Sequence, residues 1–332
     1  MASSQPGFKT IKEHSIELAP ALWEMGFRPF YLLASLFAAL SIPLWVARYA
    51  GYLPAPYLPG ALWHGYEMLF GYTTAVIAGF LLTAVRTWSG QLTPTRLPLA
   101  GLALLWLLGR IVVLMPYPLA AIIINVSFPL AVAIAIAVPL IKAANRRNYF
   151  AVVLLILMAS ASLMFQLTTI GVVAWPGYFS LQVGLDLVLL IMVVIAGRVI
   201  PMFTNNAISG TKATRNSYVE KTALAGVIFL LVADILQPPP QVITLIAGAT
   251  AAAHTVRLFL WQPWRTIQTP LVWILHAAYA WVIAYLVLRG LASNGLAAPS
   301  VAIHALTVGA IGSVTIGMMA RTSLGHTGHR RR

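Results

Sequence analysis

The residues best suited to chemistry in this sequence are a few ionisable side chains inside long apolar stretches. His64 and Glu67 are three residues apart, so a helix places both on one face. His254 and His276 stand in two consecutive apolar stretches. Neutral imidazole is a common ligand of metals and haem iron, and the interiors of helix bundles are where such sites are built. The pattern therefore predicts a metal or haem site held by histidines.

The elements that must position these side chains are membrane-spanning helices. Of the 332 residues, 60% are hydrophobic and 8% are charged, whereas a soluble domain carries about 25% charged residues. We predict an all-α fold, a polytopic transmembrane helix bundle of about ten spans, because a span needs about 20 apolar residues. The stretches that meet this length are 28–47, 64–85, 97–115, 118–141, 149–173, 180–203, 217–236, 242–261, 270–289 and 300–320.

The basic residues predict how this bundle is oriented. They gather in the N-terminal segment, in the even-numbered links between spans and in the tail, while the odd-numbered links hold only Arg48 and Arg289. Basic loops remain on the cytoplasmic side of a membrane, so both termini are expected to be cytoplasmic. Residues 1–27 then form a short N-terminal segment without the apolar core of a signal peptide, residues 28–320 the bundle and residues 321–332 a basic tail. This topology explains the net charge of +14 without a nucleic-acid partner.

Depth in the membrane, counted at about 1.5 Å per residue, sorts the ionisable residues into two layers. The outer layer contains His64, Glu67, Arg110, Asp186 and His304. The inner layer contains His254 and His276, with Arg198 and Arg257 at a similar depth. The two inner histidines can face each other, because their spans are consecutive and antiparallel. In the outer layer, we expect Arg110 to pair with Asp186.

Other interpretations of these polar residues involve no bound cofactor. A single histidine in a bundle is often a hydrogen-bonded core residue, and His64 with Glu67 can lie among lipid headgroups at a helix end. Polar residues at two depths can also line a pathway for a small solute, a metal or haem. The sequence has no cysteine, which excludes disulfides, thiolate metal sites and iron–sulfur clusters.

Five segments carry a resemblance to a known family. They are RPFYLLASLFAAL at 28–40, WHGYEMLFGYTTAVIAGFLLTAV at 63–85, GRVIPMFTNNA at 197–207, LHAAYAW at 275–281 and HALTVGAIGSVTIGMMARTSLGHTG at 304–328. In this order they resemble the NnrS family. The resemblance implies a multi-pass protein of the bacterial inner (cytoplasmic) membrane that takes part in nitric oxide metabolism or in tolerance of nitrosative stress. It also implies haem and copper as cofactors.

The sequence departs from the family pattern at two places. Tyr66 stands where the family usually has a second histidine, in a WH-x-HEM motif, so a copper site of that type would lack one ligand here. Family members usually continue for about two more spans, and we expect this sequence to lack them.

The residues and the resemblance together assign the candidate sites. His254 and His276 are expected to bind a b-type haem, with Arg198 and Arg257 as partners of its propionates, since arginine binds carboxylates bidentately. A metal or proton-handling site is expected at the outer face from His64, Glu67 and His304. A further candidate metal ligand, on the cytoplasmic side, is His326.

The function expected is that of a haem or haem/copper membrane protein, and the sequence leaves open whether it is a redox enzyme acting on nitric oxide. The expected partners are the lipid bilayer, nitric oxide or another small ligand, and a respiratory electron donor. One alternative is a membrane transporter or cofactor-handling protein for a small solute, metal or haem. Another is an assembly partner of a respiratory complex, with no cofactor of its own.

Overall fold

The computed structural model describes residues 21–326 except residues 54–56 and 59. The described residues form helices, turns and links and contain no β-strand, which confirms the all-α prediction. They divide into two compact units, of which unit 1 ends at Gly177 and unit 2 begins at Tyr178.

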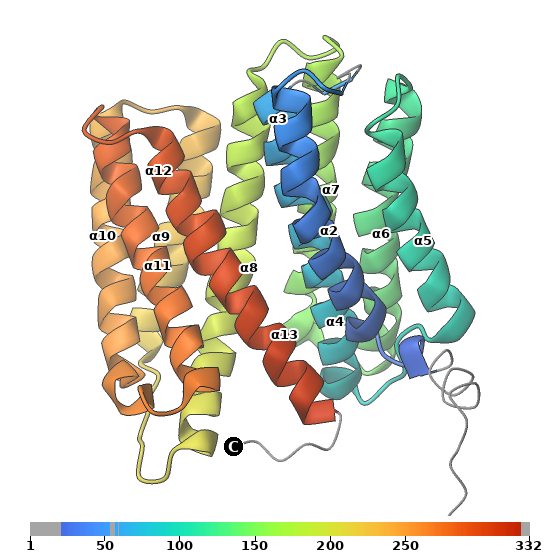
Figure 1. The fold of residues 1–332 in the computed structure, drawn as a ribbon. Helices are drawn as coiled ribbons and strands as arrows, with labels where there is room; N and C mark the ends of the chain where they lie inside the picture. Colours follow the sequence, from blue (N-terminus) through green and yellow to red (C-terminus); the bar gives the residue numbers. More distant parts are fainter. Residues whose placement is uncertain (1–20, 54–56, 59, 327–332) are drawn as a thin grey trace, which may run out of the picture. The chain divides into compact units, whose positions relative to one another are not determined.

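Unit 1 follows the first five predicted spans. Its helices are α2 (Phe27–Tyr49), α3 (Gly60–Tyr66), the π-helical segment η1 (Glu67–Thr73), α4 (Thr74–Ser89), α5 (Arg96–Val112), α6 (Pro118–Lys142) and α7 (Phe150–Thr169). Helix α4 ends at Gly90, whose φ of 66° lies in the left-handed region that glycine adopts readily. Helix α4 packs against both α2 and α6, and α6 packs along α7 (Figure 1).

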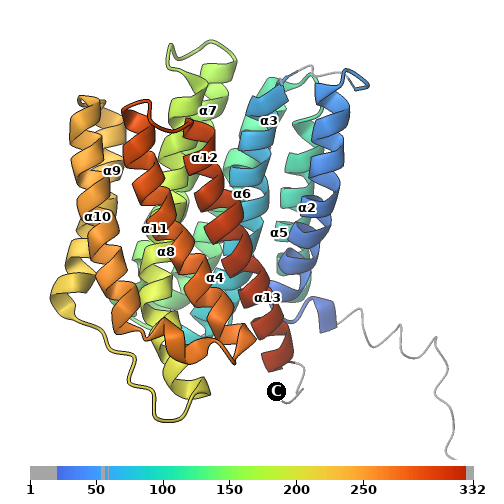
Figure 2. The ribbon, with the colours of Figure 1, turned by 60° about the vertical axis from the view of Figure 1, so that its left-hand side comes forward.

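Unit 2 follows the remaining five predicted spans. Its elements are α8 (Gly177–Ala207), α9 (Ser217–Leu236), α10 (Pro240–Leu260), the 3-10 turn η3 (Pro263–Thr266), α11 (Pro270–Ser293), α12 (Pro299–His304), the π-helical segment η4 (Ala305–Gly312) and α13 (Ser313–His326). Proline opens α10, α11 and α12, where its missing N–H costs no helical hydrogen bond. Helix α10 packs against α9 and α11, and α11 packs along the continuous stretch from α12 to α13 (Figure 2).

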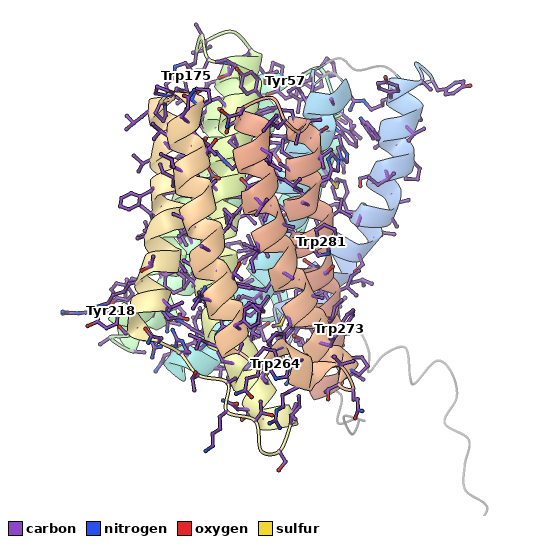
Figure 3. The ribbon with its side chains drawn as sticks, turned by 90° about the vertical axis from the view of Figure 1, so that its left-hand side faces the viewer. Tyr57, Trp175, Tyr218, Trp264, Trp273 and Trp281 are labelled. Atoms are coloured by element: carbon purple, nitrogen blue, oxygen red, sulfur yellow. The ribbon has the colours of Figure 1, made fainter. Side chains whose placement is uncertain are left out.

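The helices have the length and composition of a polytopic membrane protein. Among the described residues, eight helical stretches are long and apolar enough to cross a membrane. The other two predicted spans are helical as well: α5 has 17 residues, and α9 carries Glu220, Lys221 and Asp234. Tyrosine and tryptophan often lie at membrane interfaces. In unit 1, Tyr57 and Trp175 lie at one end of the helices (Figure 3).

Two helical stretches contain a π-helical segment, each close behind a histidine. Segment η1 begins three residues after His64, and η4 begins directly after His304. Within η1, the hydroxyl of Thr73 donates to the carbonyl of Met68 at 2.8 Å. Short π-helical segments are rare and occur frequently at functional sites. The residue types of these segments do not distinguish a π-helix from an α-helix.

Two arginines expected in the outer links lie inside helices instead. Arg48 is in the last turn of α2 and Arg289 is in α11, and both are buried. Arg48 Nη2 donates to the carbonyl of Leu58 at 2.7 Å, and its guanidinium lies 4.9 Å from the ring centroid of Trp63. An arginine near a helix end can thus be held inside the protein by a backbone carbonyl and an aromatic ring, although Nε and Nη1 of Arg48 have no hydrogen-bond partner among the described residues. Helix α13 also continues past the expected boundary at residue 320, to His326.

Candidate functional site

The two histidines of the inner layer both belong to unit 2, and both are buried. His254 on α10 has an exposed fraction of 0%, and His276 on α11 has one of 2%. Helices α10 and α11 pack along each other, as expected for consecutive antiparallel spans. The prediction of a polar site in the interior of the bundle therefore agrees with where these side chains lie.

Tyr279 on α11 holds one nitrogen of His254. The Tyr279 hydroxyl lies 2.5 Å from His254 Nδ1. The other nitrogen of this ring, Nε2, is buried and makes no hydrogen bond of regular geometry, although the backbone of Ala223 on α9 lies within hydrogen-bonding reach of the ring. When imidazole binds a metal through one nitrogen, the second N–H normally donates to another protein group, which fixes the tautomer and the ring orientation. Tyr279 acts as such a group when Nδ1 carries the proton, because its oxygen then accepts from both Nδ1 and Arg257.

Thr204 on α8 determines which nitrogen of His276 carries the proton. Thr204 Oγ1 donates to the carbonyl of Ile200 at 2.9 Å. The same oxygen lies 2.9 Å from His276 Nε2, so Nε2 donates to it. His276 Nδ1 therefore keeps its lone pair in the neutral ring, and this nitrogen is buried without a hydrogen-bond partner. A neutral imidazole with an available lone pair is the form that binds a metal.

Arg257 on α10 is already engaged by protein groups. Its Nε and Nη2 atoms donate to the two carboxylate oxygens of Glu220 at 2.8 and 2.6 Å. Its Nη1 atom donates to the carbonyl of Val193 at 3.1 Å and to the hydroxyl of Tyr279 at 2.8 Å. The guanidinium lies against Gly197 of α8, where a Cβ atom would collide with it. The charge of Arg257 is thus balanced inside the protein, by Glu220.

The structure adds three residues to the inner site that the sequence analysis did not select. Tyr279 follows His276 by three residues and so shares its helix face, which is a signal that the sequence does contain. Glu220 is one of only seven acidic residues in the chain. Thr204 has no comparable signal, because hydroxyl side chains are common in membrane helices. The other propionate candidate, Arg198, is half-buried on α8.

The outer-layer residues of unit 1 form a buried ion pair. Glu67, the first residue of η1, accepts a hydrogen bond from Arg110 of α5, and both side chains are buried. Arg110 also donates to Asn125 Oδ1, and the Asn125 amide donates to the carbonyl of Ala121 at 2.8 Å. Glu67 Oε1 is buried without a hydrogen-bond partner. The guanidinium lies against Gly71 of η1, where a Cβ atom would collide with it.

The expected pairing of Arg110 with Asp186 is wrong. Arg110 pairs with Glu67 within unit 1, whereas Asp186 of unit 2 accepts from Arg289 Nη1 at 3.2 Å. The expected pair rested only on the similar depths of Arg110 and Asp186 in the membrane. Arg289 was expected in a link between spans and so was not considered as a partner. The error arises because depth gives the height of a residue along the bundle and not the neighbour that it faces.

The remaining metal-ligand candidates are distributed over both units. His64 on α3 stacks against Trp45 of α2, with ring centroids 4.7 Å apart. His304 ends α12, and its Nδ1 donates to the carbonyl of Ser300 at 2.7 Å. His326 ends α13, and its side chain lies outside the described part of the chain. Among the described residues, no three histidine, aspartate or glutamate side chains gather closely enough to hold a metal ion. The outer metal site stays a prediction.

Comparison with known proteins identifies a family. A family model with the description NnrS protein matches residues 21–332. This range includes every helix described above. No curated protein and no solved structure matches the chain.

Proposed function

The chain belongs to the NnrS family of membrane proteins associated with the nitric oxide response, and we propose that it is a haem protein that acts on nitric oxide in the bacterial inner membrane. His254 and His276 of unit 2 would hold the haem. The observation that carries this proposal is the state of the two rings: each has one nitrogen at a hydroxyl group, and Nδ1 of His276 is buried without a partner. Buried polar atoms are nearly always hydrogen-bonded, so a ligand would account for this nitrogen.

The surrounding residues have the chemistry to support such a site. A haem held there would supply an iron that can exchange an electron with nitric oxide, and nitric oxide would bind this iron in place of one of the two histidines. Tyr279 orients the ring of His254, and Thr204 orients that of His276. Trp261 packs on Tyr279 with ring centroids 4.5 Å apart, which keeps the Tyr279 hydroxyl in place. A cluster of buried side chains excludes water from this part of unit 2, and its members are Ile200, Trp261, Leu275 and Tyr279.

The test is an absorption spectrum of the detergent-purified full chain, expressed with added haem, in the oxidised and dithionite-reduced states. We expect a Soret band that shifts when nitric oxide is added. His254→Ala and His276→Ala should each lose haem, because each removes a ligand. His64→Ala and His304→Ala are matched controls that should retain it. Full haem in both unit 2 variants, with loss in His64→Ala, would exclude the proposed ligands.

Copper is measured in the same sample. Tyr66, at the position of the family histidine, is fully buried, and its hydroxyl is 2.9 Å from Ser162 Oγ of α7. A phenol is a poorer copper ligand than imidazole. We therefore expect haem without stoichiometric copper, and more copper in Tyr66→His.

A transporter or cofactor-handling protein is a second candidate, favoured by one observation. Each unit contains a span whose regular α-helix changes to a π-helical segment, η1 in unit 1 and η4 in unit 2. Interrupted helices in both halves of a chain are typical of transporters. Proteoliposomes that take up haem, a metal or a small solute faster than empty liposomes would favour this function. Purified protein with neither haem nor flux would favour an assembly role.

A further inference from the structure

A second buried cluster of ionisable residues lies in unit 2, and the proposed haem site does not use it. Its members come from three helices: Gln182 and Asp186 from α8, Asp234 from α9, and Tyr285 and Arg289 from α11. Asp186 has an exposed fraction of 0% and Asp234 one of 4%. Asp234 and Arg289 stand near the C-terminal ends of α9 and α11. The cluster is therefore close to one end of unit 2.

Arg289 bridges the two carboxyl groups. Its Nη2 atom donates to Asp234 Oδ2, while Nη1 donates to Asp186 Oδ1 at 3.2 Å and to the hydroxyl of Tyr285 at 2.6 Å. Gln182 Nε2 donates to the same Asp186 oxygen at 3.2 Å. The second Asp186 oxygen, Oδ2, is buried without a hydrogen-bond partner. The two carboxyl groups also lie within hydrogen-bonding reach of each other.

The charges of this cluster do not balance when both carboxyl groups are ionised. One guanidinium then faces two carboxylates, which leaves a net charge of −1 in an apolar interior. An unbalanced charge there is costly, and two carboxylates that share one site cannot easily both ionise. Glu67 and Arg110 in unit 1 show the contrasting case, in which one carboxylate pairs with one arginine.

Other ionisable groups do not change this count. The ionisable residues on the helices of the cluster and on the helices packed against them, apart from their ends, are Arg198 on α8, Glu220 and Lys221 on α9, His254 and Arg257 on α10, His276 on α11, and Arg321 on α13. The nearest of them in level is Arg257, which donates to the carbonyl of Val193, seven residues or about 10 Å along α8 from Asp186. Its charge is balanced by Glu220. His304 ends α12, which packs on α11, but its ring is exposed and hydrogen-bonds to Ser300.

We propose that Asp186, Asp234 and Arg289 form a proton-binding site that exchanges one proton with water at the end of unit 2 marked by residues 237–239. Uptake forms one O–H bond on a carboxylate oxygen and makes the cluster neutral; release restores the charge of −1, and no electron is transferred. Asp186 Oδ2 suits this role, because a proton on it can donate toward Asp234. Asp234 is the member of the cluster nearest to this end. Its backbone carbonyl accepts a hydrogen bond from Gln237 Nε2 at 2.6 Å, and Gln237 is exposed.

Infrared spectroscopy of the full chain in detergent tests the proton directly, because a protonated carboxyl group has a C=O stretch distinct from that of a carboxylate. At neutral pH we expect this band in the wild type and a shift of the band in D2O. Asp186→Asn and Asp234→Asn should each abolish it, since the remaining carboxylate pairs with Arg289. The control Glu24→Gln, which removes an exposed carboxylate that has its own arginine, Arg96, should keep the band.

Three results of this experiment would overturn the proposal. They are the absence of the band in the wild type, its persistence in both aspartate variants, and the absence of a shift in D2O. A bound cation in place of the proton is tested by replacing choline chloride with sodium chloride at constant ionic strength. We expect the band to be unchanged, and its loss in sodium would overturn the proposal in favour of a cation site.

Thermal unfolding in detergent provides a second test, which also checks that the variants fold. Asparagine resembles a neutral carboxyl group, so each single variant should unfold within a few degrees of the wild type. The double variant leaves Arg289 without a counter-charge and should unfold at a much lower temperature. The proposal would be overturned if each single variant unfolded at a much lower temperature than the wild type and if the two decreases added up to that of the double variant. The infrared and thermal-unfolding measurements are both made with and without added haem. Their outcome can then be distinguished from that of the haem-binding test.

Discussion

The hydroxyl group of Tyr279 lies 2.5 Å from Nδ1 of His254. The same hydroxyl accepts a hydrogen bond from Arg257, which is bound to Glu220 through two hydrogen bonds. These contacts connect α9, α10 and α11 within unit 2. The orientation of the proposed haem ligand His254 thus depends on an ion pair that does not itself contact the ring.

Removing the Tyr279 hydroxyl should weaken haem retention. In Tyr279→Phe, His254 keeps its ligating nitrogen but loses the group that fixes its tautomer, so we expect about 10–100-fold faster loss of haem. Haem transfer to an excess of apomyoglobin measures this rate. Tyr218→Phe is the matched control, because Tyr218 is 82% exposed. Equal rates in the two variants would show that Tyr279 does not position the ligand.

The ion pair of unit 1 should be strongly coupled. Glu67→Gln leaves Arg110 buried without a counter-charge, so we expect the free energy of unfolding to fall by about 3–5 kcal/mol. The double variant Glu67→Gln with Arg110→Met should recover part of this loss, because no charge remains buried. Denaturant unfolding in detergent measures both values.

A surface ion pair supplies the control for this prediction. Glu24 pairs with Arg96 at 3.3 Å, and both side chains are exposed. Glu24→Gln should change the free energy of unfolding by only about 0–1 kcal/mol. If Glu67→Gln lowered the free energy of unfolding no more than Glu24→Gln does, the prediction of a strongly coupled buried pair would be wrong.

The π-helical segment of unit 1 should tolerate no side chain at Gly71. A Cβ atom there would collide with the guanidinium of Arg110 and the carboxylate of Glu67. Gly71→Ala should therefore lower the free energy of unfolding, measured with denaturant in detergent, by about 1–3 kcal/mol, as overpacking a core does. Gly101→Ala on α5 is the control: a Cβ atom there has open space, and alanine favours a helix. A Gly71→Ala protein as stable as the wild type would mean that the side chains of Glu67 and Arg110 can move away to make room for the Cβ atom.

The two propionate candidates should behave differently. Arg257→Lys removes the bidentate contact with Glu220, so it should destabilise the protein even without haem. Arg198→Lys should lower haem retention and leave the haem-free protein close to the wild type in stability. Unfolding temperatures with and without haem separate the two effects. Unchanged haem retention in Arg198→Lys would remove Arg198 from the site.

The sequence predicted the spans better than the contacts between them, for physical reasons. Span 217–236 agrees with α9 because local signals mark its ends: Asn216 accepts from the backbone N–H of Tyr218 at 2.9 Å, and prolines follow residue 236. The pairing of Arg289 with Asp186 has no local signal, since it depends on which helices are neighbours. The π-helical segments were missed for a related reason, because π-helical and α-helical stretches contain the same residue types.

The places where an arginine lies against a glycine have a consequence for how this sequence can change over evolution. Gly71 leaves room for Arg110, and Gly197 leaves room for Arg257. An added methyl group at either glycine displaces a guanidinium. A smaller residue at either arginine leaves a cavity beside a carboxylate that has lost its counter-charge. A substitution at the glycine or at the arginine of a pair is therefore tolerated only when the other residue changes too. In an alignment of relatives, we expect the two positions of each pair to covary, although they lie far apart in the chain.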